Sequence, residues 1–305
     1  MISLSLGNMD HVQFLHRVED VYPTFGQDHN GLEILGYDVE TITEEVTCDS
    51  ERIGGGWAMD DVWFGGSLEN SFDANSSSGG STGLGGSLAR FSIAGDHLYA
   101  VDESSLKVFH IGEGENLEKI NDAVIGWGIE TLFGYDEKLF VGGMTGMSIY
   151  DLVDPTQPEY LGGYDHIWSC DPVFVKEDYA YVTLRSGTPC DGFTNQLDLV
   201  NISDPRNVRL EKTFQMKNPH GLSIDRDNLF LSEGDHGLKV YDISNPHQLD
   251  QNLRQFLTQI ETRDIISLPG ESDIILVVGP RGIYQFDYSD PSQLRELSFI
   301  TLPGF

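Results

Sequence analysis

Apolar and polar residues alternate with a period of two along most of this chain, and the alternation recurs in five similar segments. Each segment contains two alternating stretches joined by a turn, and the second stretch ends in an aromatic-Asp-aliphatic triplet or a variant of it. This pattern predicts β-strands and shows no helical periodicity. The five pairs are FSIAGDHLYAV (91–101) with SLKVFHI (105–111), LFGYDEKLFV (132–141) with GMSIYDL (146–152), VFVKEDYAYVTL (173–184) with NQLDLVNI (195–202), LSIDRDNLFL (222–231) with GLKVYDI (237–243), and IISLPGESDIILVV (265–278) with GIYQFDY (282–288).

The spacing of the triplets indicates the architecture. Their central residues lie 41, 50, 41 and 45 positions apart, and a turn such as Asp154-Pro155 follows, in which proline fixes φ. A weaker fourth strand comes next, for example at 158–164 or 293–300. Four strands per repeat predict an all-β fold, a β-propeller of four-stranded blades, whereas a β-sandwich would not explain the fixed period. The central residues are His110, Asp151, Asn201, Asp242 and Asp287.

The repeats divide the chain into three parts. Residues 1–18 resemble 282–300, so we expect them to form the outer strands of a partial N-terminal blade. This interpretation predicts a chain that begins within a repeat, as an N-terminally truncated part of a larger propeller. Residues 19–86 fit no repeat. Five full blades follow over 87–305, at about 87–129, 130–170, 171–219, 220–263 and 264–305.

The segment 19–86 is acidic and rich in glycine and serine, and we expect it to lie as a cap over the loop face of the propeller. Its centre places Trp57 and Trp63 among glycines. Exposed aromatic side chains on such a scaffold bind sugars or anchor a protein partner. The alternative is that they hold the loop against the body of the protein.

The net charge of the chain makes two classes of partner unfavourable. Acidic residues number 49 and basic residues 18, which gives a net charge of −31. Nucleic acid and anionic membranes are therefore disfavoured, because both require a basic face. The acidity serves either solubility or the binding of hard cations. No apolar run approaches 18 residues, so no transmembrane segment is expected. No signal peptide is visible in residues 1–14, which fits a cytosolic protein or a signal located upstream.

Aligning the repeats places one residue of each blade at the same position, just before the innermost strand. These residues should surround the mouth of the central channel, with Arg90 and Arg263 beside them. Three carboxylates and a histidine there would attract a divalent cation, and carboxylate ligands favour Ca²⁺, Mg²⁺ or Mn²⁺ over zinc. The alternative is a solvated polar mouth without a ligand. The predicted metal ligands are Glu130, Asp171, His220 and Asp264, and the predicted ligand-binding residues also include Arg263, Trp57 and Trp63.

Two further features concern the loops on the same face. Asp235 and His236 are adjacent, so we favour a turn over an acid–base pair. Cys170 and Cys190 map to one face of one blade, so we predict a disulfide between them, and two separate thiols are the alternative. Cys48 has no predicted partner within the chain.

Several stretches carry a resemblance to a known family. GLKVYDIS (237–244) resembles the LVIVD repeat of bacterial and archaeal surface proteins, and GWGIETLF (126–133), SCDPVFV (169–175), 179–205 and NPHGLSID (218–225) resemble one branch of that family. The resemblance implies an exported propeller, often a lipoprotein. It also implies two more repeats in front of this chain, as in a seven-bladed ring. The family has no established activity to transfer.

Two functions remain after these observations. The first is a non-enzymatic, extracellular, cell-surface or periplasmic binding or scaffold module that engages a protein or glycan through its loop face. The alternative is a cation-dependent hydrolase or lyase at the channel mouth. No GxSxG, HExxH or phosphate-loop motif supports an enzyme, and no catalytic residue is assigned.

Overall fold

The computed structural model describes residues 2–5, 13–17, 87–112, 116–165, 172–185, 194–268 and 272–301. The chain divides into two compact units, one formed by 1–18 with 74–305 and the other by 19–73. All described residues belong to the first unit. The sequence predictions that lie outside the described residues are those for the insertion, Cys48, Trp57, Trp63, Cys170, Asp171 and Cys190.

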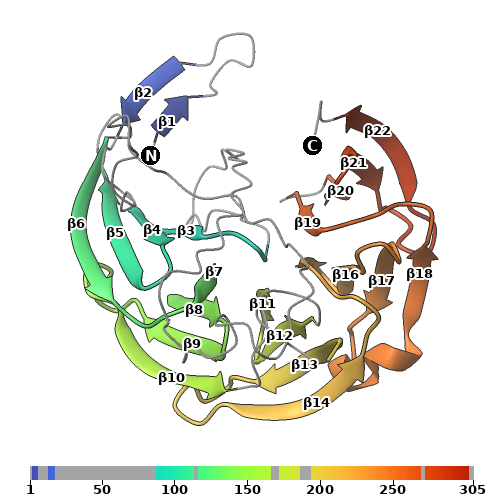
Figure 1. Ribbon diagram of the computed structural model, residues 1–305, viewed down its shortest axis with the longest axis horizontal. Helices are drawn as coiled ribbons and strands as arrows, with labels where there is room; N and C mark the ends of the chain where they lie inside the picture. The colour runs from blue at the N-terminus through green and yellow to red at the C-terminus, as the bar shows by residue number, and fades with distance from the viewer. Residues whose placement is uncertain are drawn as a thin grey trace, which may run out of the picture. The chain divides into compact units, whose positions relative to one another are not determined.

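Five four-stranded antiparallel sheets form the blades of a β-propeller, so the predicted all-β fold and its five full repeats are confirmed (Figure 1). Within each sheet the strands lie in sequence order, from the innermost to the outermost. Blade 1 contains β3 (Phe91–Ala94), β4 (His97–Val101), β5 (Ser105–Ile111) and β6 (Leu117–Val124); blade 2 contains β7 (Ile129–Tyr135), β8 (Lys138–Gly143), β9 (Gly146–Asp151) and β10 (Glu159–Asp165). Blade 3 contains β11 (Val173–Lys176), β12 (Tyr179–Leu184), β13 (Gln196–Asn201) and β14 (Arg209–Gln215). Blade 4 contains β15 (Leu222–Asp225), β16 (Asn228–Ser232), β17 (Leu238–Asp242), the 3₁₀ helix η3 (Pro246–Gln251) and β18 (Leu253–Leu257); blade 5 contains β19 (Asp264–Ser267), β20 (Ile274–Gly279), β21 (Gly282–Asp287) and β22 (Arg295–Thr301).

Two strands near the N-terminus form a sheet of their own. β1 (Ile2–Ser5) pairs antiparallel with β2 (Gln13–Arg17), and Ile2 lies opposite Arg17. The sheet contains these two strands alone within the part of the chain that the structure describes. Their assignment to the outer strands of a partial blade stays a prediction.

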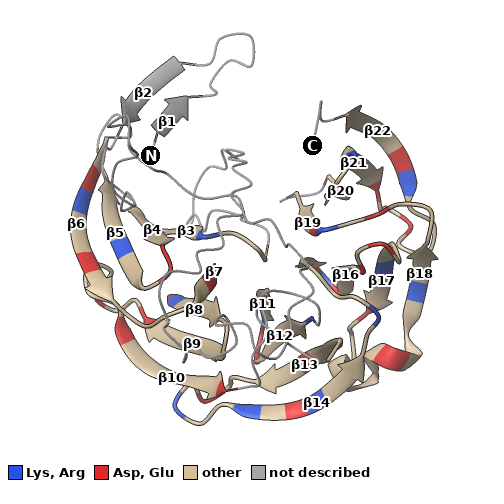
Figure 2. Cartoon of the chain, in the orientation of Figure 1, with Lys and Arg blue, Asp and Glu red and all other residues tan. Residues whose placement is uncertain are grey.

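The hydrophobic core lies between neighbouring blades. One cluster joins Phe174 and Tyr181 of blade 3 to Leu222 and Leu229 of blade 4, and the equivalent clusters join the other consecutive blades. Burying one such side chain contributes about 1.5–3 kcal/mol. Burial decreases outward: every residue of β4 is buried, whereas every residue of β22 is exposed. The outer strands accordingly carry charges of both signs (Figure 2).

The central Asp or Asn of the repeated triplet caps the turn that follows the third strand in blades 2 to 5. In blades 2 to 5 its side-chain oxygen accepts a hydrogen bond from the backbone N–H two residues later, as in an Asx turn. This interaction gives the repeated Asp or Asn a structural role. The pairs are Asp151 with Val153 at 2.9 Å, Asn201 with Ser203 at 3.1 Å, Asp242 with Ser244 at 2.8 Å, and Asp287 with Ser289 at 2.8 Å. Blade 1 has His110 at this position.

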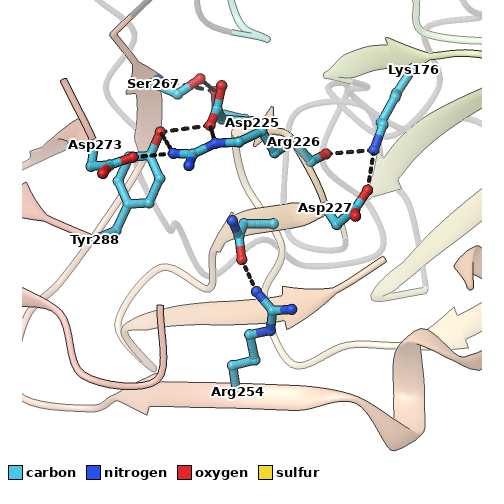
Figure 3. A network of polar contacts seen from close by, with 10 residues as sticks. Lys176, Asp225, Arg226, Asp227, Arg254, Ser267, Asp273 and Tyr288 are labelled. Atoms are coloured by element: carbon cyan, nitrogen blue, oxygen red, sulfur yellow. Dashed lines mark hydrogen bonds and ion pairs between the residues drawn. The ribbon is translucent and has the colours of Figure 1, made fainter. Parts of the chain in front are cut away.

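A polar network joins the turns between the first and second strands of blades 3, 4 and 5 (Figure 3). Lys176 donates to the Asp227 carboxylate at 2.7 Å and to the backbone carbonyl of Arg226. Arg226 in turn contacts the carboxylate of Asp273 and, at 3.3 Å, the hydroxyl of Tyr288. Arg226 itself has a left-handed backbone, with φ of 50°. The network therefore fixes the spacing of three consecutive blades on the side of the molecule that carries these turns.

Candidate functional site

A half-buried arginine and a half-buried histidine from neighbouring blades meet just before the inner strand of blade 4. Arg185 follows β12, and His220 precedes β15 by two residues. The Arg185 Nη1 atom lies 3.0 Å from both ring nitrogens of His220. Each ring nitrogen forms hydrogen bonds in the plane of the ring, and the two nitrogens point in different directions. One atom cannot lie along both directions at once, so an atom equally close to both nitrogens lies over the face of the ring. The Nη1 atom of Arg185 thus lies over the imidazole ring, and the guanidinium and the ring are in direct contact.

The backbone holds His220 in place from two blades. Its N–H donates to the Ser232 carbonyl at 2.8 Å within blade 4, and its carbonyl accepts from the Thr183 hydroxyl of blade 3 at 2.9 Å. The ring also packs against Gly234, where a Cβ atom would lie 2.9 Å from Nε2. Gly234 has φ of +58°, so the tight turn and the close approach of the ring both favour glycine.

The electrostatics of this site keep His220 neutral. Burial lowers the His220 pKa to about 3, Arg185 and Arg263 act in the same direction, and Asp235 opposes them. Burial and Arg263 also lower the pKa of Arg185, whereas Glu130 raises it. The result is a neutral imidazole close to two cationic groups. We call Arg185, His220 and Arg263 the arginine–histidine cluster.

Arg263 differs from Arg185 because its side chain is exposed. Its backbone is fixed: the carbonyl accepts from Gly221 N–H at 2.8 Å, and its own N–H donates to the Val278 carbonyl at 2.7 Å. Its guanidinium makes no hydrogen bond or ion pair with any residue in the described ranges. The cluster therefore presents one solvent-exposed positive charge on a rigid backbone.

Asp264, the next residue, has a different environment. Its carboxylate accepts hydrogen bonds from its neighbour Ile265 N–H at 2.9 Å and from the Ser87 hydroxyl. Burial raises the Asp264 pKa to about 7, although part of the residue still meets solvent. The carboxylate closes over Gly221, where a Cβ atom would lie 2.0 Å from Oδ1.

Ser87 links the start of blade 1 to blades 4 and 5. Its hydroxyl oxygen is buried and accepts from Leu222 N–H at 2.8 Å, in addition to its bond with Asp264. The segment that leads into β3 thus reaches the inner strands β15 and β19. This contact joins residues 135 positions apart in sequence.

The structure places some of the predicted site residues together and separates others. Glu130, His220 and Arg263 all act on Arg185 or lie against it, whereas Asp264 is engaged by Ser87. Within the described ranges, the ligand atoms of Glu130, His220 and Asp264 do not all lie within 4.8 Å of one another. Because Asp171 lies outside these ranges, the four-residue metal site stays a prediction.

Two residues of the site were missed by sequence reasoning. Arg185 carried a weak signal, since it is a charged residue directly after the buried strand YAYVTL. Ser87 carried none, because it ends a Gly/Ser-rich stretch. The adjacent residues Asp235 and His236 lie in a tight turn, in which His236 N–H donates to the Glu233 carbonyl at 3.0 Å.

No protein-family model and no curated protein matches the sequence. Solved structures do resemble the fold. A protein from Lactobacillus plantarum is 13% identical, with a TM-score of 0.53 over 68% of each chain. A functionally unknown protein from Desulfotomaculum acetoxidans is 11% identical, with a TM-score of 0.51 over 68% of this chain and 66% of its own. A computationally designed protein, Ika8, is 14% identical with a TM-score of 0.48, and the match covers 68% of this chain and 60% of that one.

The two similarities with TM-scores above 0.5 concern the fold alone, and the chain spans 60% to 68% of the length of the three solved structures. Across the described residues, no helix is long and apolar enough to cross a membrane.

Proposed function

We propose that this chain is a non-enzymatic binding module of the LVIVD-repeat type, displayed outside the cytoplasm, and that the arginine–histidine cluster receives an acidic group of a protein or glycan partner. One observation carries the proposal: Arg263 exposes a guanidinium without an anionic partner among the described residues, close to a half-buried arginine and a neutral histidine. A guanidinium presents paired N–H donors that match a carboxylate.

The composition of the chain supports the same proposal. The chain has 49 acidic and 18 basic residues, yet the Arg263 guanidinium forms no ion pair with a carboxylate in the described ranges. Burial is the main cause of the lowered Arg185 pKa, and repulsion by Arg263 lowers it further. An acidic ligand group would relieve that repulsion, which favours binding of an anion at this place.

The alternative function, a cation-dependent hydrolase or lyase, has less support from the geometry. A divalent cation at His220 would lie beside the guanidinium of Arg185, which repels it. The neutral His220 ring is covered on one face by that guanidinium. The described residues therefore favour an anionic ligand over a metal ion at this cluster.

A glycan array tests the proposal, with uronic-acid-bearing, sialylated and neutral glycans, together with acidic peptides. We expect binding to acidic members only. Arg263→Glu should reduce this binding at least about tenfold, because truncating or reversing a charge that pairs with the ligand costs 2 kcal/mol or more. Arg209→Glu, a charge reversal at another exposed arginine on the outer strand β14, is the matched control. Equal binding of neutral glycans, or unchanged binding by Arg263→Glu, would contradict the proposal.

A further inference from the structure

Two histidines and an aspartate meet in blade 1, at the first hairpin turn. Asp96 lies in the turn between β3 and β4, His97 begins β4, and His110 lies near the end of β5. His97 and His110 are direct cross-strand partners. Such partners have Cβ atoms about 4.5–5.5 Å apart, so their side chains emerge side by side.

The three side chains place one ligand atom each within 4.8 Å of the others. His97 Nδ1 lies 2.7 Å from one Asp96 carboxylate oxygen, and His110 Nδ1 lies 3.6 Å from the other. The two imidazole rings have their centroids 5.4 Å apart. Zinc–nitrogen and zinc–oxygen bonds are about 2.0–2.2 Å long, so neighbouring ligand atoms on one ion are roughly 3 Å apart. The observed distances are close to that spacing.

The buried nitrogen of His97 supports a ligand more directly. The His97 side chain is 9% exposed, and its Nδ1 atom has no hydrogen-bond partner. The nearby Asp96 oxygen is close in distance, but the two groups are not aligned as donor and acceptor. A buried polar atom without a partner is rare and costs stability, so each case requires an explanation. A metal ion bound at this atom would remove the cost.

The comparison with the other blades isolates this feature. The cross-strand pair equivalent to His97 and His110 contains no histidine in blades 2 to 5, and the residue in the triplet caps a turn there. In blade 1 the capping residue is replaced by an imidazole that faces Asp96. The equivalent pairs are Lys138 with Asp151, Tyr179 with Asn201, Asn228 with Asp242, and Ile274 with Asp287.

We propose that Asp96, His97 and His110 bind one divalent transition-metal ion, with Zn²⁺ as the favoured species. Two imidazoles and one carboxylate are a ligand set that suits zinc, copper, nickel or cobalt rather than Ca²⁺ or Mg²⁺. The Asp96 and His110 side chains are 64% and 41% exposed, so the ion can enter from solvent and keep water in its remaining positions. Asp154, in the turn after β9 of blade 2, interacts electrostatically with His97 and adds negative potential.

The site differs from the predicted carboxylate ring in place and in chemistry. It lies at the turn between the first and second strands of blade 1, whereas the ring was expected before the inner strands. Its ligands select a borderline metal instead of a hard cation. The binding of an acidic partner at the arginine–histidine cluster is independent of it.

Isothermal titration of tag-free, EDTA-treated protein with ZnCl₂ tests the site. Because His97 is buried and its replacement could unfold blade 1, the test variants are His110→Gln and Asp96→Asn, which alter exposed groups. We expect one zinc site in the unmodified chain and at least about tenfold weaker binding in each variant, since even supporting residues of a metal site contribute 10–100-fold. Circular dichroism melts should show that both variants fold.

His236→Gln is the matched control, because His236 is also a half-exposed histidine beside an aspartate, with Nε2 3.7 Å from Asp235. Its zinc binding should be unchanged. Cobalt substitution gives a second readout: ligation by nitrogen and oxygen yields visible d–d bands without the intense near-ultraviolet charge transfer of thiolate ligation. Absence of zinc binding, undiminished binding by His110→Gln, or a thiolate band would overturn the proposal.

Discussion

Blades 1 and 4 are built on the same backbone plan and share a buried ion pair. Each has a lysine on its third strand, three residues before the centre of the triplet, and an acidic residue directly after its second strand. Lys107 pairs with Asp102 in blade 1, and Lys239 pairs with Glu233 in blade 4. Both lysines are buried, so each depends on its partner to offset the loss of hydration.

The two carboxylates differ in how they are satisfied. Glu233 is fully buried and accepts hydrogen bonds from the backbone N–H groups of Lys217 and Asn218, at 2.9 and 2.7 Å. Asp102 is partly exposed and is bound within its own turn. Burial acts to raise its pKa, but hydrogen bonds from Lys107, Ser104 and Ser105 outweigh burial and lower the pKa to about 2. Blade 4 thus uses its ion pair to hold the segment that leads to His220.

The blades diverge most at the triplet. Asp242 of blade 4 caps a turn and pairs with Arg254, whereas His110 of blade 1 faces Asp96 and His97. The backbone and the cross-strand partnership are unchanged between them. The repeat thus places the central triplet residue at the same point of each blade. Where that residue is His instead of Asp, a side chain that caps a turn is replaced by a candidate metal ligand.

The largest effect is expected from neutralising the carboxylate of blade 4. Glu233→Gln leaves the Lys239 ammonium buried without its counter-charge, and we expect a loss of about 3–5 kcal/mol in the free energy of unfolding. Urea denaturation measures it. Asp102→Asn is the matched variant in blade 1 and should cost less, about 1–3 kcal/mol, because Asp102 still meets solvent. Equal losses would show that the two pairs do not differ in the way described.

The second prediction concerns the residue before the inner strand. Gly221→Ala would place a Cβ atom against the Asp264 carboxylate, and we expect a loss of about 1–3 kcal/mol from overpacking. Blade 1 has Arg90 at the same position, where the side chain reaches the Ile129 carbonyl at 3.1 Å. Arg90→Ala should cost about 1 kcal/mol by loss of that hydrogen bond. Urea denaturation of both variants is the measurement, and a larger effect for Arg90→Ala would refute the argument.

The third prediction is a pH dependence due to His220 of blade 4, which blade 1 cannot have at the equivalent position because Ala89 occupies it. The His220 pKa is lowered to about 3 in the folded chain, so the unfolded chain binds a proton first as the pH falls below 6.5. Stability is therefore complete above that pH and decreases toward pH 3, by roughly 1–2 kcal/mol between pH 7 and pH 5.

His220→Gln should remove this part of the pH dependence when melting temperatures are compared from pH 8 to pH 4. Asp264→Asn should remove a pH dependence of stability that runs in the opposite direction. The Asp264 pKa is raised to about 7, so the native acid group loses stability as the pH rises from about 4 to 7, and the amide would not. If the melting temperatures of both variants and the unmodified chain change with pH in parallel, the environments described for His220 and Asp264 are wrong.

The smallest expected effect on stability distinguishes the capping residue Asp242 of blade 4 from His110 of blade 1. Asp242→Ala removes the hydrogen bond to Ser244 N–H and the pairing with Arg254, and we expect a loss of about 1 kcal/mol. His110→Ala, measured in EDTA, should change stability by less than about 0.5 kcal/mol. A larger loss for His110→Ala without metal would mean that the imidazole is structural.

The fold was accessible from the sequence because its signals are local. Alternation, the triplets and the Asp-Pro turns each lie within about ten residues, and the strands predicted at 158–164 and 293–300 correspond to β10 and β22. The partners of the site side chains are not local. Arg185 and His220 are 35 residues apart, and no periodicity indicates that this guanidinium contacts that ring.

The histidine site shows what a repeat can and cannot predict. His110 was visible in the sequence as a departure from the triplet. Its role as a candidate metal ligand depends on His97, which lies on a different strand, and on Asp96, which lies in a turn. The register of β4 and β5 brings these side chains to His110. The departure of His110 from the triplet was therefore the one sign of this site that the repeat itself offered.

The bond between Ser87 and Leu222 also has a consequence for the order of folding. Blade hairpins close over a few residues, so they can form early, whereas this contact must wait until blades 1 to 4 have been gathered, because closing a long loop costs entropy. It is therefore expected to form after the transition state, and Ser87→Ala should accelerate unfolding while leaving the refolding rate almost unchanged. A single buried hydroxyl would then lengthen the time for which the assembled blades remain together.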